Sequence, residues 1–410
     1  FKVDLPTKGK GGRFQLFGIG GVSHIDLLDS KRDPEEWTFT TSGTDVYFKS
    51  NMGVIGLNHK IFLSNNTYWS NTISTTHTSN KIASDSLVAI ALTPARTYNN
   101  NSTEGEISLN STLNTKFNAK SSWRNGVIVD LMNTNYKEEF FSNETNRWYS
   151  LTDFTGSSVL LQAFSQWRYK FSDKFILNTG AHYQLFTLNN SDIVEPRIGM
   201  RYKITKKQSL NLASGLHSQI HPLRVYLLET RHDDGTTSKT NENLDFTKSL
   251  HVVLGYKANL FKNVNFKIET YYQNLYSIPV EENSFYSMSN IGADFVSSGV
   301  DRLLNGGTGE NYGLEVTLEK MFSKGYYYLV NVSLYNSTYK GGDGVSRNTA
   351  FNGQYTSNAL AGYEIKINQK LTIDINAKMS FAGGKRYPKI DIASSIENGM
   401  LPMISRLFMS

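Results

Sequence analysis

The amino-acid sequence predicts an all-β protein, a transmembrane antiparallel β-barrel. Three observations lead to this fold class. Segments of about ten residues alternate apolar and polar side chains, which is the length that a tilted strand needs to cross a bilayer. The connections between these segments are alternately tight and long, and aromatic residues lie near both ends of the segments. No stretch approaches the roughly 18 consecutive apolar residues of a transmembrane helix, so a membrane-spanning form of this chain must be a closed barrel.

Residues 311–340 show the alternation most clearly. The first arm of this predicted hairpin divides into an apolar and a polar face, with Leu314, Val316 and Leu318 against Glu315, Thr317 and Glu319. The segment Phe322-Ser323-Lys324-Gly325 reverses the chain. The second arm then places Tyr326, Tyr328, Val330, Val332 and Leu334 on one face. Such a unit is typical of a β-hairpin with one apolar side.

The same pattern recurs along the whole chain and predicts roughly sixteen strands, too many for side chains to fill the interior of a barrel. In chain order we expect strands at residues 1–5, 13–25, 52–63, 67–78, 106–117, 121–136, 158–171, 175–186, 195–204, 209–219, 249–260, 264–276, 311–320, 326–340, 355–367 and 371–381. The last arm is nearly ideal, because Leu371, Ile373 and Ile375 alternate with polar side chains.

The connections alternate in length. Tight turns are expected near residues 64–67, 118, 172–174, 205–208, 261–263, 322–325 and 368–370, and long polar loops at 26–44, 79–103, around 147–149, 229–245 and 279–309. Outer-membrane barrels have short periplasmic turns and long extracellular loops, whereas soluble sandwiches rarely keep this asymmetry. We therefore expect the tight turns to face the periplasm.

Aromatic side chains near the strand ends support the membrane assignment. They lie beside tight turns (Phe171, Phe175, Phe322 and Tyr326) and toward the loop ends (Tyr276, Tyr339 and Phe381), as two interfacial girdles require. The alternative explanation is that Tyr and Phe are common in strands of any kind. The regular alternation of tight and long connections favours the membrane barrel.

Composition excludes several other classes. The 410 residues carry a net charge of +6 from 42 basic and 36 acidic side chains spread along the chain, so no basic patch suggests nucleic acid as a partner. The sequence has no cysteine, which excludes disulfides and thiolate metal sites. Neither a leader nor an internal linker is visible. We expect one domain, residues 1–410, that is an internal piece of a longer protein.

Several segments, taken together, closely resemble the barrel of TonB-dependent outer-membrane receptors. They are NGGTGENYGLEVTLEKMFSKGYYYLVNVSLYNSTYKG, RNTAFNGQYTSNALAGYE, FAGGKRYPKID, EPRIGMRY, NENLDFTKSLHVVLGY and HSQIHPL. The resemblance covers essentially the whole chain, and none of these motifs is catalytic.

The resemblance implies a barrel of about 22 strands in the outer membrane of a Gram-negative bacterium, with a plug in its lumen. It also implies TonB as a partner, which acts through a short box in an N-terminal plug and supplies energy for ligand import. No plug sequence precedes Phe1, so we expect the chain to be truncated at both ends and the plug to lie outside it. The ligand class stays open between siderophore, glycan and peptide, and a surface lipoprotein is a further possible partner.

Nine charged residues alternate with apolar positions and are expected to face the lumen, since a Lys or Arg on the lipid face near the midplane costs about 2 to 4 kcal/mol. They are Arg197, Arg201, Lys203, Lys267, Glu269, Glu315, Glu319, Asp374 and Lys378. Two roles are open for them. They hydrate the lumen, or, as the resemblance implies, they hold the plug by ion pairs and hydrogen bonds.

Ligand capture is expected in the long loops. Their aromatic and basic side chains offer stacking faces beside polar groups (Arg147, Trp148, Tyr149, Phe285 and Tyr286). The same side chains could equally pack the loops against one another.

Signals of catalysis or of a bound metal are weak. His217 and His221 are four residues apart, but they precede Pro222 on an extended chain and lack the glutamate of the zinc-protease pattern. The segment His232-Asp233-Asp234-Gly235 could hold a cation, or it is a solvated loop. We therefore expect no enzyme activity, metal or cofactor. Two other functions stay open, a passive porin without a plug and a soluble or surface-exposed β-rich adhesin.

Overall fold

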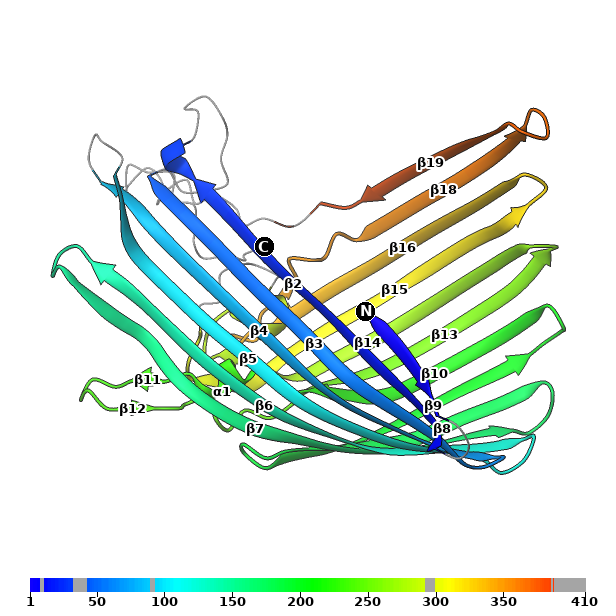
Figure 1. The fold of residues 1–410 in the computed structure, drawn as a ribbon, viewed down its shortest axis with the longest axis horizontal. Coiled ribbons are helices and arrows are strands. Elements are labelled where there is room, and N and C mark those ends of the chain that lie inside the picture. Colours follow the sequence, from blue (N-terminus) through cyan, green and yellow to red (C-terminus); the bar gives the residue numbers. More distant parts are fainter. Residues whose placement is uncertain (8–10, 32–42, 89–92, 292–298, 385, 387–410) are drawn as a thin grey trace.

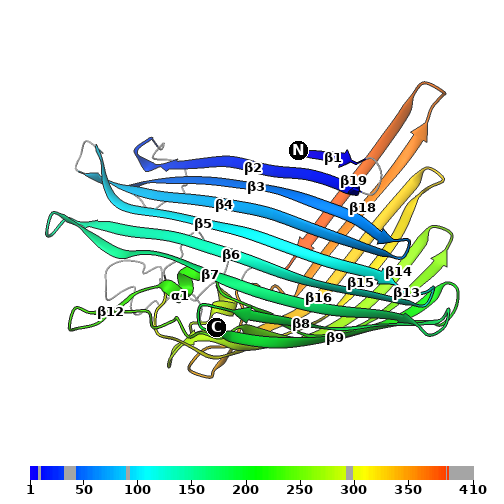
Figure 2. The ribbon, with the colours of Figure 1, turned by 60° about the horizontal axis from the view of Figure 1, so that its bottom comes forward.

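The computed structural model describes residues 1–7, 11–31, 43–88, 93–291, 299–384 and 386 as one large, curled antiparallel sheet. The sheet has 17 strands, and a separate pair of two-residue strands stands apart from it. Along the sheet each strand pairs with its neighbours in the chain (Figure 1). Figure 2 shows the same curled sheet turned by 60°, so that the lower edge of Figure 1 comes forward.

The first half of the chain contains the four longest strands, which are β4 to β7. The elements are β1 (Lys2–Pro6), β2 (Arg13–Leu28), η2 (Asp29–Lys31), β3 (Thr44–Ser64), β4 (Thr67–Val88), β5 (Thr93–Lys116), β6 (Ser121–Ser142), β7 (Arg147–Lys170), β8 (Phe175–Phe186), β9 (Ser191–Lys203) and β10 (Gln208–Gln219).

The second half carries the insertions between strands. Its elements are α1 (Leu223–Leu227), β11 (Thr230–Arg231), β12 (Thr237–Ser238), β13 (Thr247–Phe261), β14 (Val264–Glu281), η3 (Met288–Asn290), β15 (Leu303–Ser323), β16 (Tyr326–Lys340), β17 (Ser346–Asn348), β18 (Tyr355–Lys366) and β19 (Thr372–Ala382). Within the described residues no helix has the length and apolar character needed to cross a membrane.

The roughly sixteen predicted strands are all present, and the three-residue β17 is the one sheet strand that the alternation did not predict. The predicted loop at 79–103 was wrong: β4 continues to Val88 and β5 begins at Thr93. Polar side chains on both faces misled the prediction. They occur because these hairpins continue past the apolar band, where cross-strand polar contacts replace lipid contacts on the outer face, as between Asn99 Nδ2 and Glu139 Oε1 at 3.3 Å. The predicted loop at 26–44 falls largely on residues outside those described.

The predicted tight turns gather at one end of the sheet (Figure 1). The expected regular alternation of connection length was wrong in part, because the connections between β6 and β7 and between β8 and β9, at the other end, have four residues each, as many as the turn between β7 and β8. In the turn between β15 and β16, Lys324 and Gly325 have φ angles of 55° and 81°. Positive φ at both central residues is the type I′ geometry, whose twist matches that of the flanking strands. Only glycine adopts this conformation without strain from a Cβ atom.

Replacing Gly325 by valine should destabilise the folded protein by about 1 to 2 kcal/mol, because a β-branched side chain would be forced into the left-handed region. The measurement is the thermal unfolding midpoint of the detergent-purified full-length protein. Lys324→Gly is the matched control, since it places a glycine, which adopts positive φ without strain, at the neighbouring position of the same turn. An unchanged midpoint for Gly325→Val would contradict the turn geometry.

Three tryptophans mark one boundary of the apolar band, near the tight turns. Each indole N–H donates across strands to a serine hydroxyl: Trp69 to Ser111 at 2.8 Å, Trp123 to Ser165 at 2.7 Å and Trp167 to Ser121 at 3.0 Å. Their side chains are about two-fifths exposed. A ring with an apolar body and a satisfied polar edge suits the membrane–water interface.

Candidate functional site

The register of the sheet separates an outer, apolar face from an inner, polar one. Directly paired residues share a face. Thr270 pairs with Leu314, which pairs with Leu334, and this row presents exposed leucines. The adjacent row runs through Glu269, Glu315 and Ser333 and faces the other way. We call these two faces the outer and the inner face.

The structure places all nine predicted lumen residues on the inner face. They lie on β9 (Arg197, Arg201 and Lys203), β14 (Lys267 and Glu269), β15 (Glu315 and Glu319) and β19 (Asp374 and Lys378). The register brings Glu269 directly opposite Glu315, whereas the β19 pair lies far from β9 in the pairing order. Contact of these residues with a plug stays a prediction.

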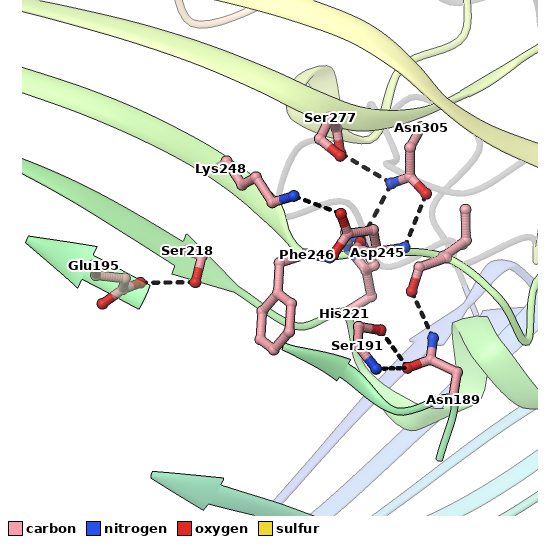
Figure 3. Close-up of polar contacts among 11 residues, drawn as sticks. Asn189, Ser191, Glu195, Ser218, His221, Asp245, Phe246, Lys248, Ser277 and Asn305 are labelled. Carbon is pink, nitrogen blue, oxygen red and sulfur yellow. Dashed lines mark hydrogen bonds and ion pairs between the residues drawn. The ribbon is translucent and has the colours of Figure 1, made fainter. Parts of the chain in front are cut away.

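Glu195 is the centre of a polar cluster on the inner face. Its side chain is fully buried, although it belongs to a wall strand next to the exposed Arg197. Four side chains surround the carboxylate. Ser218 Oγ donates at 2.7 Å and Gln184 Nε2 at 3.1 Å, His182 Nδ1 lies 2.7 Å away, and the Arg197 guanidinium forms an ion pair. Figure 3 shows the contact between Glu195 and Ser218. A buried carboxylate is tolerated where its oxygens are satisfied in this way.

The cluster continues along the wall through the second ring nitrogen of His182, Nε2. His182 Nε2 lies 3.1 Å from Gln162 Oε1, and Gln162 Nε2 donates to Asp130 at 2.8 Å. Asp130 also accepts from Ser108 Oγ at 2.5 Å. Six strands, β5 to β10, are therefore connected by one chain of polar side chains. The hydroxyls of Ser108 and Ser218 both donate to carboxylates and not to His182, and the contacts connect neighbouring strands of the wall.

Sequence reasoning did not single out Glu195, His182 or Asp130. Glu195 could have been found, because it precedes Arg197 by two residues on the same alternating face. His182 and Asp130 required the register between strands.

His217 has a different neighbour from the one its spacing suggested. Its ring lies 4.7 Å from that of His251 on β13, and His251 contacts Gln273 Nε2 at 2.9 Å. His221 lies beyond the strand, beside Tyr226. In the part of the chain that the structure describes, no three His, Asp or Glu side chains are grouped so that they could hold a metal ion. At the tip of the 232–235 segment, Asp234 accepts hydrogen bonds from the backbone and hydroxyl of Thr236.

A structured insertion packs against the inner face at the loop end. We call residues 220–246 the mouth insert; it contains α1, β11 and β12. Its side chains form a buried apolar cluster with the wall strands β6 to β8. The fully or nearly buried members are Leu223, Tyr226, Leu227, Leu244 and Phe246 from the insert, Tyr136, Phe154, Leu160 and Phe186 from the wall, and Leu303 from β15.

The fit between insert and wall is close. A Cβ atom at Gly156 on β7 would lie 2.4 Å from Leu227 Cδ1, so the glycine leaves the space that Leu227 occupies. Phe186 and Tyr226, both 0% exposed, pack with ring centroids 4.9 Å apart. The predicted polar loop at 229–245 is therefore only partly solvated, and its ends belong to a small hydrophobic core.

Three asparagines connect the mouth insert to its surroundings. Asn241 is fully buried; its Nδ2 donates to the carbonyls of Val225 and Val300, and its Oδ1 accepts from Leu303 N. Asn305 bonds the backbone of Asp245 and Ser277, and Asn189 donates to the carbonyl of Leu244 at 2.8 Å (Figure 3). Because each amide satisfies backbone groups from separate segments, the insert is held in one position.

The predicted ligand-binding residues are divided between two places. The structure corrects the location of Arg147, Trp148 and Tyr149, which begin strand β7 rather than lie in a loop. Trp148 packs edge-on against Phe141, and Tyr149 stacks on Phe140, each at 5.6 Å. These cross-strand pairs extend the hairpin and explain why the strand begins early. Trp148 and Tyr149 remain 41% and 40% exposed.

The second pair, Phe285 and Tyr286, lies between β14 and η3. Tyr286 packs against the apolar cluster of the mouth insert, and burial raises the pKa of its hydroxyl to about 12. Ligand binding by any of the five residues stays a prediction.

The mouth insert should lose stability in mild acid. His221 is 6% exposed, its backbone N–H donates to the Tyr226 hydroxyl and its Nε2 lies 3.3 Å from the carbonyl oxygen of Asp245. Burial lowers the pKa of its imidazole, and the nearby carbonyl and carboxylate of Asp245 only partly offset this shift. The unfolded insert therefore binds the proton first. The insert is fully stable above about pH 6.5, and it becomes less stable as the pH falls below that value.

Hydrogen exchange of residues 220–246 at pH 8 and pH 5, normalised to the intrinsic rates, measures this effect. We expect weaker protection at pH 5, and a much smaller difference in His221→Gln. Equal protection at both pH values in the unmodified protein would contradict the prediction.

A family model described as "TonB dependent receptor-like, beta-barrel" matches residues 5–392. A search of curated proteins found no matching sequence. Among solved structures, the ferric yersiniabactin uptake receptor FyuA from Yersinia pestis is similar at 12% identity and a TM-score of 0.66, over 93% of this chain and 58% of that chain.

Two other solved structures are similar to this chain to about the same degree. The FrpB iron transporter from Neisseria meningitidis matches at 14% identity and a TM-score of 0.63, over 92% of this chain and 59% of that one. The RagAB peptide transporter matches at 9% identity and a TM-score of 0.61, over 92% of this chain and 56% of that chain. The chain thus spans less than two thirds of each of these proteins, and at such identities the likeness concerns the fold.

Proposed function

Because the chain belongs to the TonB-dependent receptor β-barrel family, we propose that it forms the wall of an outer-membrane receptor that imports a ligand into the periplasm. In this proposal the ligand binds at the loop end, and energy delivered through TonB moves it inward. The structurally similar proteins are named as receptors and transporters, which agrees with transport rather than an enzyme reaction.

The observation that carries the proposal is the polar inner face of a wide wall. A wall of 17 strands is too wide for its own side chains to fill. Apart from the mouth insert, the inner face presents polar and charged groups such as Arg201, Glu315 and Lys378, while the outer face is apolar. Such a wall suits a water-filled or protein-filled lumen.

We further propose that a plug and additional barrel strands belong to the same protein. The shares of 56% to 59% that the chain covers in the three similar structures leave room for both. The mouth would then be formed by the insert, which packs against β6 to β8, and by the long hairpins of β3 to β5 beside it. The aromatic pairs around Arg147 offer stacking surfaces there for a siderophore, glycan or peptide. A surface lipoprotein that covers the mouth is compatible with this arrangement.

Liposome swelling tests whether the lumen is plugged. The full-length gene product is reconstituted, and the liposomes are diluted into isotonic solutions of neutral sugars of increasing size, from arabinose to raffinose. A plugged receptor should swell no faster than liposomes without protein. Fast, size-dependent swelling would establish a passive porin instead. Binding of the same product to the immobilised periplasmic domain of TonB tests the energy coupling separately.

A further inference from the structure

Four of the tight turns have the same hydrogen-bonded form, with a lysine at the same place. In each turn the backbone N–H of the lysine donates to the Asn, Ser or Thr side chain two residues earlier, at 2.8 to 3.2 Å. The turns are Asn118-Ala119-Lys120, Ser172-Asp173-Lys174, Thr205-Lys206-Lys207 and Asn368-Gln369-Lys370. Because such a turn is stabilised through the backbone of its third residue, it makes no demand on that residue's side chain.

A fifth turn shows that the lysine is not needed for this geometry. Between β3 and β4, the backbone N–H of Asn66 donates to Ser64 Oγ at 3.2 Å in the same arrangement. Two further turns at this end have two residues each, and the first is again a lysine, Lys262 between β13 and β14 and Lys324 between β15 and β16. Six turns thus carry a lysine that the course of the backbone does not explain.

The six lysines are free to interact with a partner outside the wall. All of them are exposed: Lys120, Lys174, Lys207, Lys262, Lys324 and Lys370. No ion pair joins any of them to another residue in the described part of the chain. At the opposite end of the sheet, the four-residue connections 143–146 and 187–190 contain no lysine. We call the six residues the lysine rim.

An exposed apolar side chain precedes each lysine of the rim. In the four shared turns it lies three residues before the lysine and is 41% to 54% exposed (Phe117, Phe171, Ile204 and Ile367). These four lie an even number of residues from exposed apolar side chains of the outer face in the strands that lead into the turns (Leu113, Leu161, Ile198 and Tyr363). They therefore belong to the outer face as well.

The two-residue turns follow the same rule. Phe261 directly precedes Lys262, and Phe322 lies two residues before Lys324; their side chains are 74% and 56% exposed. The tryptophans at the boundary of the apolar band lie beside this end too, and the ring centroid of Phe117 is 6.1 Å from that of Trp123. The lysine rim therefore lies just beyond the lipid-facing surface of the wall.

We propose that the lysine rim binds the phosphate groups of anionic phospholipids in the adjacent leaflet. This inference rests on the proposed function, which places the wall in the outer membrane with these turns toward the periplasm. An apolar side chain in the acyl region, followed within three residues by a lysine, forms an interfacial anchor. The apolar stem of the lysine lies along the lipid while its ammonium group reaches the headgroup.

Spacing favours separate lipids over a single compact partner. Lysine-containing turns follow one another every two strands of the pairing order, which is about 10 Å at a strand spacing of about 4.8 Å. The six turns therefore extend over about 50 Å along the wall, more than one small anion covers. All six cations are lysines and none is an arginine. A point charge on a flexible stem suits mobile headgroups, whereas arginine favours fixed, planar partners.

Tryptophan quenching by brominated lipids tests the proposal, because Trp69, Trp123 and Trp167 lie beside these turns and are partly exposed. The full-length protein is reconstituted into mixed bilayers of phosphatidylcholine and phosphatidylglycerol, with either lipid brominated in its acyl chains. Comparing the two series gives the relative affinity of the two headgroups. We expect phosphatidylglycerol to bind about fivefold more tightly at low salt. This preference should disappear in about 1 M salt, where the Debye length is about 3 Å.

Variants assign the preference to the lysine rim. Replacing all six lysines by glutamine should bring the affinity ratio close to one, whereas replacing them by arginine should keep it. Asn66→Lys, which supplies the lysine that the fifth turn lacks, should raise it. The control is Lys49→Gln with Lys81→Gln, two exposed lysines that pair with each other toward the other end of β3 and β4; it should change nothing.

Two results would overturn the proposal and leave the receptor intact. One is equal affinity for both lipids in the unmodified protein, which would leave the lysines to a soluble acidic partner. The other is a preference that persists in the glutamine variant. Absence of quenching by either brominated lipid would overturn the receptor proposal as well, because the outer face would then not contact lipid.

Discussion

Replacing Glu195 by alanine should destabilise the folded protein by about 3 kcal/mol, because a buried carboxylate with four partners would be lost. Its removal leaves Ser218 and Gln184 without an acceptor and leaves the His182 ring without the contact that orients it. Arg197 is half-exposed and contributes less, since water can solvate it once the pair is broken.

The midpoint of thermal unfolding in detergent, read from the loss of the compact gel mobility of the full-length barrel, measures this effect. We expect it to fall by several degrees in Glu195→Ala. Glu315→Ala is the matched control, because Glu315 also lies on the inner face but has no ion-pair partner among the described residues; its effect should stay within about 0.5 kcal/mol. Equal effects of the two substitutions would show that the cluster around Glu195 contributes little to stability.

Replacing Asn241 by alanine should release the mouth insert from the wall while the strands stay folded. The substitution leaves Leu303 N–H and the carbonyls of Val225 and Val300 without partners inside an apolar cluster. Each unsatisfied buried group costs about 1 to 3 kcal/mol, so the local stability of the insert should fall by about 3 kcal/mol or more.

Hydrogen exchange resolves this local effect. Exchange of amides in residues 220–227 and 300–303 should accelerate roughly a hundredfold, while the amides of β13 and β14 keep their protection. Asn243→Ala is the control, since Asn243 is exposed and lies two residues away. Unchanged protection of the insert in Asn241→Ala would mean that the apolar contacts alone hold it.

The sequence by itself determined the strands and their two faces. Alternation with a period of two is a local property of an extended chain, and it requires no knowledge of neighbouring strands. For this reason Glu315 and Arg201 could be assigned to the polar face from their immediate neighbours. The tight turns followed from the same pattern, and Gly325 follows the rule that positive φ favours glycine.

Only the tertiary structure decided which residues meet. Glu195 contacts His182 and Ser218 because β8, β9 and β10 pair in one particular register, and a shift by one residue would turn each side chain to the other face. Residues 229–245 of the mouth insert were expected to be a long polar loop. The apolar side chains of the insert are buried because a distant part of the chain offers Gly156 and Phe186 to pack against, and such non-local burial leaves no periodic signal in the sequence.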